Sequence, residues 1–129
     1  MTDQRLLSAA LTMFGIVALL LYPLAIVRPS GWAWHHGSPA ANDYFMMIVG
    51  LYATLGVFLI WAARDPAAHL SLIRFTIWSS VVHAAVMAFE AVRTPMQRDH
   101  LYGDVPALVL AAVILGVLSR PVKPSPTPS

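Results

Sequence analysis

Residues 44–63 read YFMMIVGLYATLGVFLIWAA and contain no charged side chain. A helix of about 20 residues is about 30 Å long, which equals the thickness of the hydrocarbon core of a bilayer. Uninterrupted apolar character over this length is typical of a transmembrane helix. The stretch therefore predicts that the chain is an integral membrane protein.

Three further apolar stretches follow the same general pattern, although the third contains Arg74 and Glu90 and the fourth is shorter. The first has no charge between Leu6 and Val27. We expect one domain over residues 1–120, with spans at about 6–27, 43–63, 70–92 and 104–119, followed by a disordered Pro- and Ser-rich tail over 121–129. The expected fold class is all-α, an integral membrane four-helix bundle.

The basic residues predict the orientation of these spans. The side that holds both termini and the connection 64–69 carries Arg5, Arg64, Arg74, Arg120 and Lys123. The other side carries Arg28, Arg93 and Arg98. Since basic residues are more frequent on the cytoplasmic side, we expect both termini to be cytoplasmic, and the protein to lie in a bacterial inner (cytoplasmic) membrane.

Local signals place the ends and the contacts of the helices. Asn42 is suited to cap the second span, and Pro23 should bend or end the first. The short connection 64–69 predicts that the second and third spans form an antiparallel hairpin. Small residues four apart mark candidate helix contacts. These pairs are Gly50 with Thr54, Ala84 with Ala88, and Ala112 with Gly116.

The composition excludes several classes of function. Hydrophobic residues make up 58% and charged residues 11% of the chain, and cysteine is absent. Thiolate metal sites and cysteine nucleophiles are therefore excluded. Eight Lys and Arg against six Asp and Glu are too few for a nucleic-acid-binding surface.

The ionisable residues in and beside the spans suggest a ligand pocket on the outer side. His83 lies near the middle of the third span, and an ionisable group in a membrane is a candidate functional residue. The expected pocket consists of His83, Glu90, His100, Asp104 and Asp43. Within it, Glu90, His100 and Asp104 could hold a divalent metal, although their spacing matches no metal-binding motif.

Plainer roles stand beside this hypothesis. Asp43 and Asp104 could be helix caps, and His83 could only hydrogen-bond a neighbouring helix. Since the pitch of a helix separates His83 from Glu90 by about 10 Å, we expect Glu90 to meet His100 or Asp104 at the outer mouth, with His83 deeper. We expect His35 and His36 to be interfacial loop residues beside Trp32 and Trp34, which we expect to lie at the outer interface.

Five stretches carry a resemblance to a known family. They are residues 29–32, 51–59, 62–66, 75–84 and 103–108. With these stretches the chain resembles an uncharacterised family of small bacterial four-span membrane proteins of unknown function. The resemblance implies the fold and no activity.

Two classes of function follow from these observations. The first is a small membrane protein whose outward-facing pocket binds a metal ion, a proton or a small polar or lipid ligand. The second is a structural or accessory subunit that packs in a larger membrane complex or homo-oligomer. An enzyme is less favoured, because no nucleophile elbow, phosphate loop or paired-carboxylate spacing is present.

Overall fold

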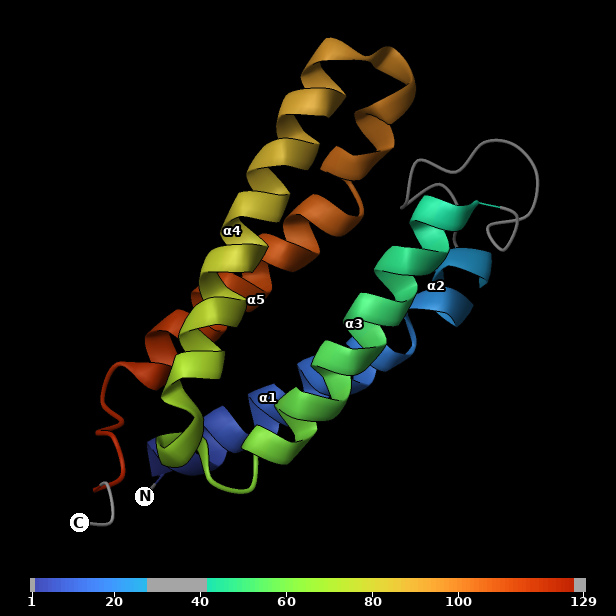
Figure 1. Ribbon diagram of the computed structural model, residues 1–129. Coiled ribbons are helices and arrows are strands. Elements are labelled where there is room, and N and C mark those ends of the chain that lie inside the picture. Colours follow the sequence, from blue (N-terminus) through green and yellow to red (C-terminus); the bar gives the residue numbers. More distant parts are fainter. Residues whose placement is uncertain (1, 28–41, 127–129) are drawn as a thin grey trace.

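The computed structural model describes residues 2–27 and 42–126, and these residues are almost entirely helical. The expected all-α fold is confirmed. Figure 1 shows the elements, which in chain order are α1 (Thr2–Leu19), α2 (Leu21–Val27), α3 (Asp43–Ala62), the 3₁₀ helix η3 (Pro66–His69), α4 (Leu70–Arg93), the 3₁₀ helix η4 (Pro95–Leu101) and α5 (Asp104–Ser119).

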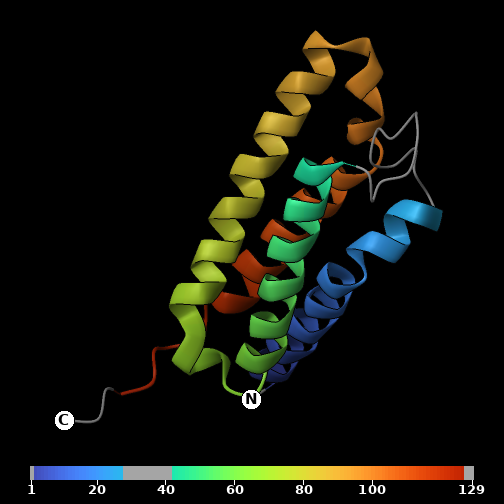
Figure 2. The ribbon, with the colours of Figure 1, turned by 45° about the vertical axis from the view of Figure 1, so that its right-hand side comes forward.

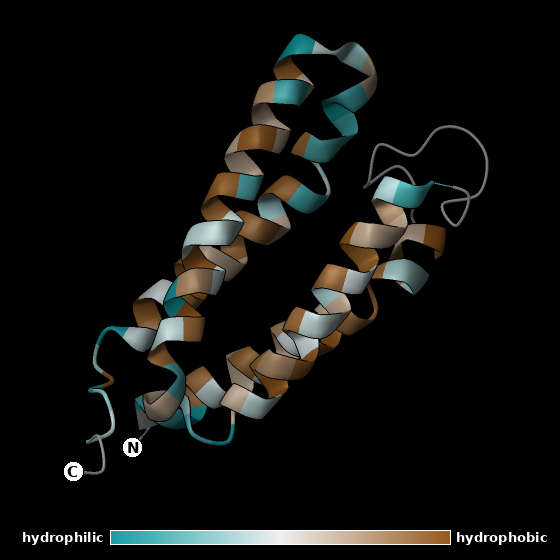
Figure 3. Cartoon of the chain, viewed as in Figure 1, coloured by the Kyte–Doolittle hydropathy of each residue, from teal (hydrophilic) through white to brown (hydrophobic). Residues whose placement is uncertain are grey.

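The described helices are long and apolar enough to cross a membrane in three places, or in four if α1 and α2 form one bent span. The three are Asp43–Ala62, Pro66–Arg93 and Pro95–Ser119. Hydrophobic residues cover most of the helix length, and hydrophilic residues gather toward the two ends (Figure 3). This distribution is the one that a bilayer would require.

The first helical stretch bends by 62° between α1 and α2. Pro23 has no N–H, so it cannot donate to the carbonyl of Leu19 four residues earlier. The helix breaks at Leu20, whose N–H donates to the carbonyls of both Ile16 and Val17. The bend expected from Pro23 is therefore confirmed.

The backbones of α1 and α3 approach each other closely at two glycines. A Cβ atom added to Gly15 would lie 2.8 Å from the carbonyl oxygen of Gly56, and one added to Gly56 would lie 2.6 Å from the carbonyl oxygen of Gly15. Real Cβ atoms are not found at such distances from backbone atoms. Glycine at both positions is therefore what allows these helices to touch.

The expected contact at Gly50 and Thr54 is wrong. Gly50 is exposed, and a Cβ atom added to it would meet nothing within 4 Å. Gly56 is six residues further on, and six steps of about 100° place it on a different face of the helix from Gly50. Ala84 and Ala112, from the other two expected pairs, are buried, but a Cβ atom added to Gly116, the partner of Ala112, would also meet nothing within 4 Å.

The helices form two pairs. In the first arm, made of α1, α2 and α3, α3 packs mainly against α1. In the second arm, made of α4, η4 and α5, α4 packs mainly against α5 and η4. The helices α3 and α4 run antiparallel, as expected, but they make little contact (Figure 1). The expected packed hairpin is therefore not formed, because each helix has a closer partner elsewhere.

The two arms join at the end of the molecule that holds both termini, here called the termini end. Side chains from all four long helices form a buried cluster there. Its members include Leu7, Leu11, Leu59, Ile73 and Leu115. At the opposite end η4 folds back beside α4, so that α5 begins well short of the tip of α4 (Figures 1 and 2).

The segment after α5 returns toward the η3 turn. Val122 packs against the buried cluster, and the N–H of Ser125 donates to the carbonyl of Ala67 at 3.3 Å. Residues 121–126 contain no helix, and the last three residues of the expected tail lie outside the described residues.

Candidate functional site

A hydrogen bond between side chains bridges the two arms. The hydroxyl oxygen of Tyr52, on α3, lies 2.5 Å from Nδ1 of His83, on α4. The two rings are tilted, with centroids 5.8 Å apart. Among the described residues this is the one hydrogen bond that joins α3 to α4. It forms where the two helices otherwise barely touch.

A second polar pair ties η4 to the start of α5. Nδ1 of His100 lies 2.8 Å from both carboxylate oxygens of Asp104, and Nε2 of His100 lies 2.8 Å from the side-chain oxygen of Gln97. His100 and Asp104 are both buried. Since a carboxylate only accepts hydrogen bonds, Nδ1 of His100 donates to Asp104.

The two pairs form one polar cluster, which we define as Tyr52, His83, Gln97, His100 and Asp104. Asp104 is an electrostatic neighbour of both Tyr52 and His83, and His100 is one of His83. The cluster thus brings together side chains from α3, α4, η4 and α5.

The polar cluster lies well within the length of the apolar helices. His83 is 13 residues from the start of α4 and ten from its end. At 1.5 Å per residue these separations are about 20 Å and about 15 Å. Tyr52 lies nine residues, or about 14 Å, into α3. Any membrane that these helices crossed would therefore place Tyr52 and His83 at the depth of the lipid chains.

The other expected pocket residues make no hydrogen bond or ion pair with this cluster in the described part of the chain. Glu90 is half-buried on α4, and in residues 2–27 and 42–126 no ion pair or hydrogen bond joins it to His100 or Asp104. The expected contact at the outer mouth is thus not formed, because the Asp104 oxygens face His100. Asp43 is exposed in the first turn of α3.

The described part of the chain contains no group of three or more histidine and carboxylate side chains that could hold a metal ion. The three expected ligands, Glu90, His100 and Asp104, therefore do not form such a group. His35, His36, Trp32 and Trp34 lie outside the described residues.

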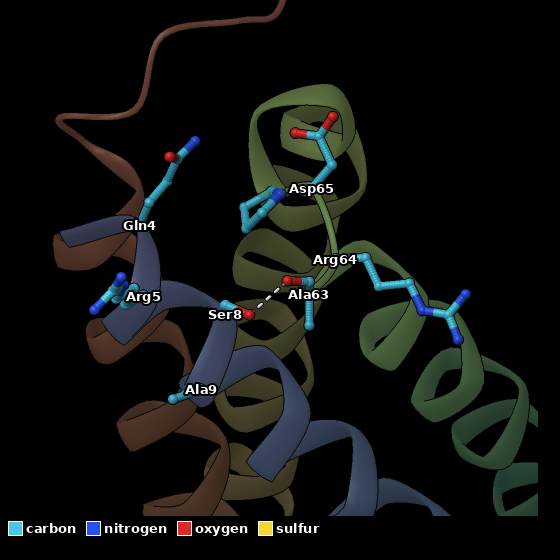
Figure 4. Close-up of a pocket in the computed structure, with 8 residues that line it drawn as sticks. Gln4, Arg5, Ser8, Ala9, Ala63, Arg64 and Asp65 are labelled. Atoms are coloured by element: carbon cyan, nitrogen blue, oxygen red, sulfur yellow. Dashed lines mark hydrogen bonds between the residues drawn. The ribbon is translucent and has the colours of Figure 1, made fainter. Parts of the chain in front are cut away.

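A shallow pocket of about 520 Å³ lies at the termini end, between the first turns of α1 and the turn before η3. Ser8 donates a hydrogen bond of 2.5 Å to the carbonyl of Ala63 at its centre. The side chains of Arg5 and Arg64 extend to opposite sides of this bond (Figure 4). Because its polar groups do not converge, this pocket is a weaker candidate than the polar cluster.

Sequence reasoning missed two members of the cluster, Tyr52 and Gln97. Tyr52 lies in an apolar stretch whose periodicity does not show which helix it faces. For Asp104 the sequence predicts a pocket residue and leaves a helix cap as the alternative. The cap position is Gly103, no side chain caps this helix, and the Asp104 carboxylate bonds His100 instead.

These features define an all-helical protein that has three or four helices of membrane-spanning length and a polar cluster between its two arms. The chain belongs to a family of unknown function, DUF6632, which it matches over residues 1–128. The expected membership of an uncharacterised family is confirmed. No curated protein and no solved structure shows detectable similarity to the chain.

Proposed function

We propose that this protein is a multi-pass protein of the bacterial cytoplasmic membrane that binds a small polar or lipid ligand between its two helical arms. The residues that we assign to the site are Tyr52, His83, His100 and Asp104. The ligand would contact Tyr52 and His83, and the buried pair of His100 and Asp104 would hold the position and charge of the site.

The observation that carries this proposal is the location of the polar cluster. Polar and ionisable groups inside a membrane are costly, and they mark ligand or ion sites more often than other positions. Here four elements contribute such groups at one level, where α3 and α4 make little other contact. A ligand could therefore reach Tyr52 and His83 without disrupting a packed helix interface.

A small molecule fits this cluster better than a metal ion does. Metal sites need several ligands gathered around one point, and the described residues offer no group of three. The polar cluster instead offers hydrogen-bonding groups of a hydroxyl and an imidazole, which suit an uncharged polar head group.

The proposed orientation predicts which residues are accessible from each side of the membrane. Because the chain has no cysteine, single cysteine substitutions report on one position only. In intact cells, a membrane-impermeant maleimide should label the Thr94→Cys variant, at the outer end of α4, whereas it should label the Ser125→Cys variant only after lysis. Thr94 and Ser125 are both exposed in the structure. The reverse pattern would show that both termini are outside.

The binding proposal predicts that the purified protein retains a ligand through His83. The protein would be isolated in mild detergent and examined by native mass spectrometry and elemental analysis. We expect one bound molecule per chain in the wild type and its loss in the His83→Phe variant, which keeps an aromatic ring. The matched control is His69→Phe. His69 lies at the termini end of α4, where it bonds the backbone of Asp65 and takes no part in the polar cluster, so this variant should retain the ligand.

The opposite outcome would favour the accessory-subunit alternative. In that case no small molecule would be retained by the wild type, and another membrane protein would co-purify at a fixed ratio. The bond between Tyr52 and His83 would then serve only to hold α3 and α4 together.

A further inference from the structure

The imidazole of His83 has one nitrogen that no described residue satisfies. Its Nδ1 atom is bonded to Tyr52, while Nε2 has no partner among residues 2–27 and 42–126. In the same residues no fully buried side-chain nitrogen or oxygen lacks a hydrogen bond. The Nε2 atom of the half-buried His83 is therefore accessible from outside the helices.

The hydrogen bond with Tyr52 decides whether this free nitrogen is a donor or an acceptor. If the phenol donates to Nδ1, the neutral ring carries its proton on Nε2, and one donor remains free. If Nδ1 donates instead, the Tyr52 proton and the Nε2 lone pair both remain unused. The first arrangement leaves fewer unsatisfied groups, so Nε2–H is the free donor.

A free N–H at this depth needs an acceptor. The neighbouring exposed residues on α4, Val82 and Val86, are apolar and offer none. Leaving a polar group unpaired in lipid costs several kcal/mol, so a water molecule or a ligand oxygen should meet it. The region where α3 and α4 face each other is here called the seam. It is open to such a ligand, because the two helices make little contact there.

The surroundings of His83 limit what that ligand can be. A charge is costly to bury among lipid chains, so an anionic head group would be disfavoured at this depth. An uncharged oxygen on a membrane-soluble molecule would accept from Nε2–H without this penalty.

We propose that His83 donates its Nε2–H to the carbonyl oxygen of a neutral, membrane-soluble ligand that reaches the seam between α3 and α4 from the bilayer. This inference rests on the proposed function and names its class of ligand. The same carbonyl chemistry occurs in a quinone ring and in the ester of an acylglycerol, so both are tested.

The test uses protein labelled with ¹⁵N-histidine in nanodiscs and follows the His83 nitrogen signals by NMR. The probes are a benzoquinone with a decyl tail, dioctanoylglycerol and decanoate. We expect one of the two neutral probes to shift the Nε2 signal with saturation, and decanoate to have no effect. The His83→Phe variant should bind that probe about tenfold more weakly, the loss expected for one hydrogen bond.

Two further variants separate this inference from the proposed function. Tyr52→Phe should move the Nδ1 signal of His83 and weaken probe binding, whereas the matched control Tyr102→Phe should do neither. If the Nδ1 signal responds to Tyr52→Phe but neither neutral probe shifts Nε2, water alone meets His83. The named ligand class is then wrong, although the proposed site stands. If Tyr52→Phe leaves Nδ1 unchanged, the cluster itself is not formed and both proposals fail.

Discussion

Replacing Asp104 by alanine should lower the free energy of unfolding by about 1–3 kcal/mol, the range for leaving a buried hydrogen-bonding group without its partner. Asp104 is 7% exposed, and both of its carboxylate oxygens lie 2.8 Å from Nδ1 of His100. Without the carboxylate, the Nδ1–H group of His100 would remain buried with no acceptor. Unfolding in mixed micelles of mild detergent and dodecyl sulfate, followed by circular dichroism, would measure the change.

Two comparisons make this result specific to the pair. Asp43→Ala removes a carboxylate that also lies in the first turn of a helix but is exposed, so its cost should be below about 1 kcal/mol. The double variant His100→Leu with Asp104→Leu should be more stable than Asp104→Ala, because apolar groups replace both hydrogen-bonding partners. Equal losses in Asp104→Ala and Asp43→Ala would contradict the buried pair.

Gly56→Ala should separate α1 from α3 and destabilise the protein by about 1–3 kcal/mol, the usual cost of overpacking. The new methyl group would lie 2.6 Å from a backbone oxygen of Gly15, which cannot rotate away as a side chain could. The same mixed-micelle unfolding would measure the loss.

Gly50 and Gly116 provide matched controls for this substitution. Both lie in long helices, and a Cβ atom added to either would meet nothing within 4 Å. Alanine there should leave stability unchanged or raise it by up to about 1 kcal/mol, since alanine favours helices over glycine. A loss at Gly50 as large as that at Gly56 would show that the close approach of α1 and α3 is not the cause.

The helices could be predicted because their signals are local. Long apolar stretches indicate where helices run, and Asn42 marks the start of α3, where its side chain accepts from the N–H of Phe45 at 2.9 Å. The bend near Pro23 follows from one missing N–H group.

Which helices pack together could not be predicted from such signals. In an apolar helix nearly every face is suitable for burial, so hydrophobic periodicity does not show the partner. Gly50 and Gly56 look alike in sequence, and only the crossing of α3 with α1 distinguishes them. For the same reason the pairing of His83 with Tyr52 depends on the arrangement of separate helices. His83 stood out only as an ionisable residue within an apolar stretch.

The division into two arms has a consequence for how the chain is assembled during synthesis. The partner of α3 is α1, which leaves the ribosome first, and their contact at Gly15 and Gly56 involves neither α4 nor α5. N-terminal units generally fold before the rest of a chain is complete. The first arm can therefore form while α4 and α5 are still being translated, and the second arm then docks onto α1 as a preformed surface.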